Sequence, residues 1–140
     1  MNRRGARLAV GIGCRTGVAG PAAAALIERA LAAARALPEA AGFAPGAAVF
    51  TAVEKRAETG LVEAASRLGL ALVFLPRNAL EAVSDGTVTR SERVVQLFGV
   101  PSIAETAALA GAGPGARLIV PRMASDGITC AVAVADGRTG

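Results

Sequence analysis

Short apolar runs that suit buried strands alternate along this chain with longer segments of helical period. Residues 8–13 (LAVGIG) are short and continuously apolar, which is typical of a strand buried on both faces. After a glycine-rich turn, Pro21 suits a helix start, and apolar residues recur at helical spacing as far as Ala34. A strand, a turn and a helix in this order predict right-handed crossovers and a mainly parallel sheet with helices on both faces.

The next segments repeat this order. Residues 38–46 hold two prolines and two glycines, which indicates a loop. We expect a second strand over 47–53, a short helix over 61–68 closed by Gly69, and a third strand over 70–75.

Three capping boxes in the second half of the chain predict three short helices. In each box a polar residue stands three positions before a glutamate: Asn78 with Glu81, Thr89 with Glu92, and Ser102 with Glu105. The second helix should end at Gly99, and the third should end near Gly111.

The C-terminal part of the chain predicts a hairpin. Residues 117–120 and 128–134 are typical of strands, and Asp126 with Gly127 suits the turn between them. Strands joined this closely must run antiparallel. We therefore predict one α/β domain over 1–140, with three α/β/α layers and a mixed, mainly parallel five-stranded sheet that ends in this hairpin.

The composition argues against several classes of function. Aromatic residues make up only 3% of the chain, with no Tyr or Trp, so no stacking platform for nucleic acid is visible. There is no His, and Cys14 and Cys130 are far apart, so we expect no metal and no cofactor. The apolar runs are too short to span a membrane, and the two cysteines fit a reducing, cytoplasmic compartment. The net charge of +4 favours an acidic partner.

Basic residues follow each of the first four predicted strands. They are Arg15, Lys55 with Arg56, Arg77, and Arg122. Ligands of open α/β sheets bind beyond the carboxyl ends of the strands, so these side chains could form a basic rim for a ligand with several carboxylates. The alternative is that strand ends simply reach solvent, where arginine is common.

The segment GIGCRTG, residues 11–17, departs from the dinucleotide-binding fingerprint because Thr16 stands where the third glycine is needed. Its glycines could turn backbone N–H groups toward an anion, or they could only allow tight packing of a strand and a helix. Cys14 could be a reactive thiolate, although an inert small hydrophobe is the more common case.

Several stretches taken together resemble one family. They are GIGCRTG, Lys55 with Glu58, Gly60 and Leu61, residues 91–109 (SERVVQLFGVPSIAETAAL), and LIVPR followed by GITCAVA. In this order they resemble the cobalamin biosynthesis protein CobE and the C-terminal domain of CbiG, the cobalt-precorrin-5A hydrolase. The resemblance covers nearly the whole chain and implies the stand-alone CobE form, because the chain has no room for the further N-terminal domain of CbiG.

The resemblance implies that the chain binds a precorrin or related corrin intermediate in a basic cleft and either transforms it or passes it on. Precorrins are macrocycles fringed with carboxylates, which agrees with a basic rim. The binding residues expected on this basis are Gly11, Gly13, Cys14, Arg15, Lys55, Ser102 and Arg122.

If chemistry occurs, Glu58 or Glu105 would be the acid or base, and Lys55 would stabilise a developing oxyanion. Glu92, Ser102 and Glu105 match the family's motif, yet helix capping explains each of them as well. Two other functions stay open at this point: a non-catalytic carrier or partner of corrin-pathway enzymes, and a nucleotide-binding domain.

Overall fold

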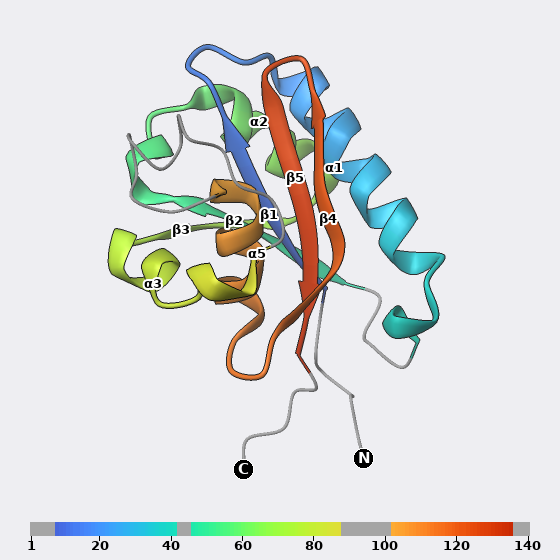
Figure 1. The fold of residues 1–140 in the computed structure, drawn as a ribbon. Coiled ribbons are helices and arrows are strands. Elements are labelled where there is room, and N and C mark those ends of the chain that lie inside the picture. Colours follow the sequence, from blue (N-terminus) through green and yellow to red (C-terminus); the bar gives the residue numbers. More distant parts are fainter. Residues whose placement is uncertain (1–7, 42–45, 88–101, 136–140) are drawn as a thin grey trace.

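Five strands form one mixed sheet at the centre of the fold, as the computed structural model shows (Figure 1). The structure describes residues 8–41, 46–87 and 102–135. The strands are β1 (Leu8–Cys14), β2 (Ala47–Ala52), β3 (Ala71–Leu75), β4 (Arg117–Ser125) and β5 (Ile128–Val134). Their order in the sheet is β3-β2-β1-β5-β4. β1, β2 and β3 are parallel, whereas β5 is antiparallel to both β1 and β4. The mixed sheet and its C-terminal hairpin are confirmed.

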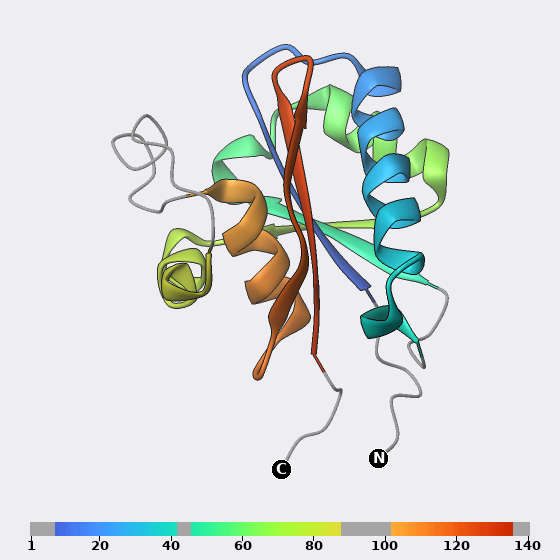
Figure 2. The ribbon, with the colours of Figure 1, turned by 45° about the vertical axis from the view of Figure 1, so that its right-hand side comes forward.

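Helices cover both faces of this sheet, so the predicted three layers are confirmed (Figure 2). One face carries α1 (Gly20–Arg35) and α2 (Thr59–Leu68), and the other carries α3 (Arg77–Glu81) and α5 (Ile103–Ala112). Three short 3-10 turns lie between these elements: η1 (Pro38–Ala40), η2 (Val53–Lys55) and η3 (Ser84–Gly86).

The larger core lies between the sheet and α1. Leu26 and Ile27 of α1 pack with the aliphatic side chains of the sheet, among them Val10, Ile12 and Val132. The exposed Glu28 and Arg29 mark the opposite side of the helix. This is the amphipathic pattern from which the helix was predicted.

On the opposite face of the sheet, β1 and β5 present small residues, so α5 lies very close to these two strands. A Cβ atom on Gly11 would overlap the carbonyl oxygen of Ala104 and stand 2.5 Å from the backbone nitrogen of Ala108. Ala131 and Ala133 of β5 complete this contact surface. The close approach explains why α5 is buried along most of its length.

Several element ends follow their predicted chemistry. Gly69 ends α2 with a φ of 68°, in the left-handed region that glycine tolerates. Ser102 is the N-cap of α5, because its side chain accepts a hydrogen bond from the backbone N–H of Glu105. Asp126 and Gly127 both have positive φ, 55° and 76°, as a two-residue type I′ hairpin turn requires.

Two predictions about element ends are wrong. β4 was expected to end at Val120 but runs to Ser125, because the register shifts between Leu118 and Met123 allow the edge strand to accommodate Pro121. Asn78 does not cap a helix, since α3 starts at Arg77 and Pro76 occupies the N-cap position. The predicted box of Thr89 with Glu92, and the helix that would end at Gly99, lie outside the described residues.

Candidate functional site at the C-terminal edge of the sheet

The carboxyl ends of β1, β2, β3 and β4 lie at one edge of the sheet, because β4 runs in the same direction as β1 through two antiparallel pairings. We call this the C-terminal edge and define it by residues 14–19, 53–58, 76–77 and 125–127. It holds four cationic side chains and three carboxylates, so the surplus of positive charge is small. Whether this edge can bind an anion therefore depends on which cations are already paired, more than on the total charge.

Arg15 is held against the β4–β5 hairpin. Its backbone N–H donates to the carbonyl oxygen of Gly127 at 3.1 Å. Its side chain lies over the same glycine, since a Cβ atom there would stand 2.5 Å from the Arg15 Nε atom. Gly127, which the sequence indicated only as a turn residue, thus makes room for the guanidinium group. The Asp126-Gly127 pair was the sequence feature that could have indicated this role of Gly127.

Glu58 is tied to the turn after β1. Its Oε1 atom accepts a hydrogen bond from the backbone N–H of Gly17 at 3.0 Å. Gly17 has a φ of 83° and open space around its Cα, so the glycine is needed for its conformation and not for room. The glycines of this turn were expected to offer backbone N–H groups to an external anion. The N–H of Gly17 instead binds a carboxylate of the protein itself.

Cys14 lies half-buried beside Lys55 and Glu58. Burial raises the pKa of the Cys14 thiol, the Lys55 ammonium partly opposes this by lowering it, and Glu58 adds to the increase. Burial also raises the pKa of Cys130, which lies in the core. A raised pKa means less thiolate near neutral pH, so the structure favours the interpretation of Cys14 as a small hydrophobe.

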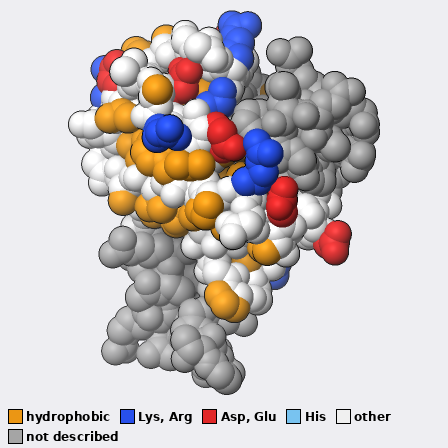
Figure 3. Space-filling model, turned by 90° about the vertical axis from the view of Figure 1, so that its left-hand side faces the viewer, with side chains coloured by type: hydrophobic (Ala, Val, Ile, Leu, Met, Phe, Trp, Pro, Cys, Tyr) orange, Lys and Arg blue, Asp and Glu red, His pale blue; other side chains and the backbone are white. Residues whose placement is uncertain are grey.

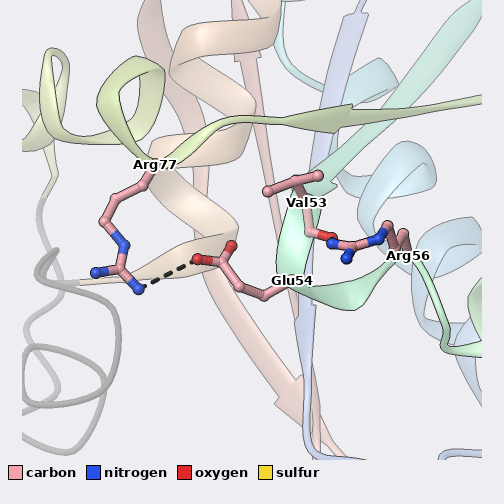
Figure 4. Close-up of polar contacts among 4 residues, drawn as sticks. All are labelled: Val53, Glu54, Arg56 and Arg77. Atoms are coloured by element: carbon pink, nitrogen blue, oxygen red, sulfur yellow. Dashed lines mark hydrogen bonds and ion pairs between the residues drawn. The ribbon is translucent and has the colours of Figure 1, made fainter.

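Arg56 and Arg77 already have partners within the protein (Figure 4). The Nη1 atom of Arg56 donates to the carbonyl oxygen of Val53 at 3.1 Å, and the Nη2 atom of Arg77 lies 3.2 Å from Glu54 Oε2. By contrast, the side chains of Arg15 and Lys55 form neither a hydrogen bond nor an ion pair with any of the described residues. These two cations are the ones left for a ligand at this edge.

Ser102, Glu105 and Arg122 form a separate group at the start of α5. Glu105 is fully buried, and its Oε2 atom accepts a hydrogen bond from the backbone N–H of Arg122 at 3.0 Å. Ser102 is 2% exposed, and its hydroxyl group caps the helix. Arg122 lies inside β4 and not after it, so it does not follow a strand end as predicted, although its side chain is exposed.

Gly11 and Gly13 are buried beneath α5. A Cβ atom on Gly13 would stand 3.0 Å from Thr129 Oγ1 and 3.1 Å from the Cβ atom of Ile103. Close packing of a strand and a helix therefore explains both glycines, and the expected glycine-lined cleft does not open at these positions. Four of the expected site residues, Cys14, Arg15, Lys55 and Glu58, are brought together around the turn after β1.

The described residues show no group of three or more Cys, Asp and Glu side chains that could hold a metal ion. None of the helices in the described ranges has the length and apolar character needed to cross a bilayer.

Comparisons with known proteins agree on one family. Residues 8–133 match the family described as "Cobalamin synthesis G C-terminus". The curated Protein CobE of Sinorhizobium sp is 35% identical over 133 residues, which cover 94% of this chain and 82% of that protein.

Two solved structures are similar over most of their length. One is the crystal structure of CobE, a protein from the cobalamin (vitamin B12) biosynthetic pathway, with a TM-score of 0.77 and 31% identity over 92% of this chain and 90% of that one. The other is the cobalamin biosynthesis protein chiG from Agrobacterium tumefaciens, with a TM-score of 0.58 and 40% identity over 91% of this chain and 98% of that one. The chain belongs to the family of the cobalamin synthesis G C-terminus, and its homologues place it in cobalamin biosynthesis.

Proposed function

We propose that this protein binds a precorrin-type intermediate of cobalamin biosynthesis at the C-terminal edge of its sheet, with Arg15 and Lys55 as its cationic contacts. The observation that carries the proposal is that Arg15, in the turn after β1, and Lys55, beside Cys14, have neither a side-chain hydrogen bond nor an ion pair among the described residues. Carboxylates on a corrin ring are suitable partners, because guanidinium and ammonium groups bind carboxylates through charge-assisted hydrogen bonds.

We favour binding and transfer of the intermediate over acid–base catalysis. Both candidate carboxylates already accept hydrogen bonds from the backbone, Glu58 from Gly17 and Glu105 from Arg122. Glu105 is also completely shielded from solvent, so it has no access to a ligand at the surface. The carrier would work in the cytoplasm with the enzymes of the corrin pathway, and two free thiols fit that compartment.

An absorption titration with cobyrinic acid, a stable corrin that carries free carboxylates, tests this proposal. The chain has no Trp or Tyr, so the corrin bands report binding without interference from the protein. We expect saturable binding of the acid and much weaker binding of its fully methylated ester, which keeps the ring but lacks the charges.

Arg15→Ala and Lys55→Ala should each weaken binding by about tenfold, which corresponds to about 1.4 kcal/mol for one charge-assisted contact. Arg67→Ala is the matched control, because Arg67 lies in the last turn of α2, away from this edge, and pairs with Glu63. Equal affinity for acid and ester would overturn the proposal. Binding of ATP or NAD without binding of the corrin would support the nucleotide-binding alternative.

A further inference from the structure

β3 is an edge strand made entirely of uncharged apolar residues (ALVFL). It pairs with β2 over five consecutive residues without a register shift, and among the described strands none pairs with its outer side. Ala71 and Val73 are exposed on it. Figure 3 shows this side of the molecule, where hydrophobic side chains gather in bands. Such a straight, uncharged edge offers unpaired backbone groups to another strand.

The opposite edge of the sheet differs in charge and in regularity. β4 contains Arg117, Pro121 and Arg122, and its pairing with β5 shifts register twice. Charged residues, proline and bulges are the means by which edge strands avoid pairing with other chains. The fold thus protects β4 and leaves β3 open.

The two exposed large hydrophobic side chains belong to β3 and to a helix packed against it. Among the described residues only two large hydrophobic side chains are exposed, Val62 at 49% and Val73 at 37%. Val73 is at the middle of β3, and Val62 belongs to α2, the helix that packs beside β3. The register pairs Gly11 with Phe50 and Phe50 with Val73, so Val73 lies on the face of the sheet that α5 covers, opposite the face that carries α2. Val73 is thus the exposed hydrophobic residue of the open edge itself.

The sequence of β3 is compatible with antiparallel pairing to itself. With a two-fold axis through Val73, Leu72 lies opposite Phe74 of the second copy and Ala71 lies opposite Leu75, so that every cross-strand pair is apolar. The cation at the end of the strand, Arg77, is ion-paired with Glu54 and would lie level with Gly69, which has no side chain. No like charges oppose each other along the strand.

We propose that β3 pairs with β3 of a second copy of this chain and joins the two sheets into one continuous sheet. A second copy is the occupant that closes the assembly, because symmetric pairing uses up both open edges. Pairing of β3 with β4 of another copy would leave open ends, and the proline and bulges of β4 oppose it. This inference is independent of the ligand proposed above.

Light scattering coupled to size-exclusion chromatography tests the inference, from micromolar to submillimolar protein. We expect twice the mass of the 13.9 kDa chain for the wild type and the monomer mass for Val73→Lys. Ala33→Lys, which adds the same charge on the exposed side of α1, should remain dimeric. Circular dichroism of the variants should be unchanged, because Val73 is exposed. If Val73→Lys fails to fold, Ala71→Lys places a charge on the same edge at a smaller exposed residue.

Hydrogen exchange distinguishes strand pairing from another dimer contact. Amides of β3 should exchange at least tenfold more slowly in the wild-type dimer than in Val73→Lys. A monomeric wild type at every concentration would overturn the inference. A dimer that survives the lysine at Val73 would also overturn it, since the contact would then lie elsewhere.

Discussion

The carboxylate of Glu58 and the backbone N–H of Gly17, 41 residues apart in the chain, are joined by a hydrogen bond of 3.0 Å. This bond fixes the turn after β1 against the start of α2. It also places a negative charge beside Lys55 and near the turn that carries Arg15. An incoming carboxylate would therefore be attracted by Arg15 and Lys55 and repelled by Glu58.

Glu58→Gln should increase the affinity for cobyrinic acid. The amide oxygen of glutamine can still accept the hydrogen bond from Gly17, so the change removes charge and keeps the turn. We expect a gain of about twofold to fivefold in the absorption titration, the size of an exposed charge interaction of up to about 1 kcal/mol. Glu39→Gln, an exposed change of the same kind in η1, is the control and should leave the affinity unchanged. Lower affinity of Glu58→Gln would show that Glu58 contacts the ligand favourably.

Glu105→Ala should destabilise the protein strongly. The change leaves the N–H of Arg122 without its partner and creates a cavity beneath α5, so we expect a loss of about 3 kcal/mol in the free energy of unfolding. Ser102→Ala removes only the cap of α5 and should cost about 1 kcal/mol. Urea denaturation measures both values. A loss below that of Ser102→Ala would argue against a structural role for the buried carboxylate.

Gly11→Ala should be more damaging than Gly17→Ala. At Gly11 the added methyl group meets the backbone of α5, which cannot move without separating the helix from the sheet, and we expect a loss of about 3 kcal/mol or more. At Gly17 space is open and only the positive φ is unfavourable, which costs about 1 kcal/mol. Thermal unfolding of both variants shows which of them loses more stability. The reverse order would mean that Gly11 is not packed against α5 as described.

The two cysteines should differ in their reactivity toward iodoacetamide. Cys14 is half-buried with a raised pKa, so its alkylation should be slow at pH 7 and should accelerate only as the pH rises above the usual range of a thiol. Lys55→Ala removes the cation that lowers this pKa, so it should slow the reaction further, whereas Arg67→Ala should not. Cys130 should react only after unfolding, because it is buried. Mass spectrometry of the alkylated chain separates the two sites, and an unaffected rate in Lys55→Ala would place Lys55 away from Cys14.

Local sequence chemistry predicts much of this fold. The left-handed Gly69, the cap of Ser102 and the Asp126-Gly127 turn each depend on one to four neighbouring residues, so their outcome can be predicted without knowing the tertiary structure. Pro121 was misleading because proline usually excludes a residue from a central strand. β4 is an edge strand with register shifts, and there proline is tolerated.

The site was harder to predict because its contacts join distant segments. The hydrogen bond between Glu58 and Gly17 has no local sequence pattern, and neither does the position of Arg15 over Gly127. The roles of Gly11 and Gly13 depend on how closely α5 approaches β1, which glycine spacing alone does not determine. The sequence could therefore identify the residues around the turn but not their partners.

The most direct test of the central claim is the change in backbone amide NMR shifts when cobyrinic acid is added. We expect the largest changes at residues 15–17, around Lys55 and Glu58, and at Gly127. We expect little change at Gly69 and Gly113, which follow the C-terminal ends of α2 and α5, far from the C-terminal edge of the sheet. Changes confined to Gly69 and Gly113, or no change at the turn after β1, would contradict binding at the C-terminal edge.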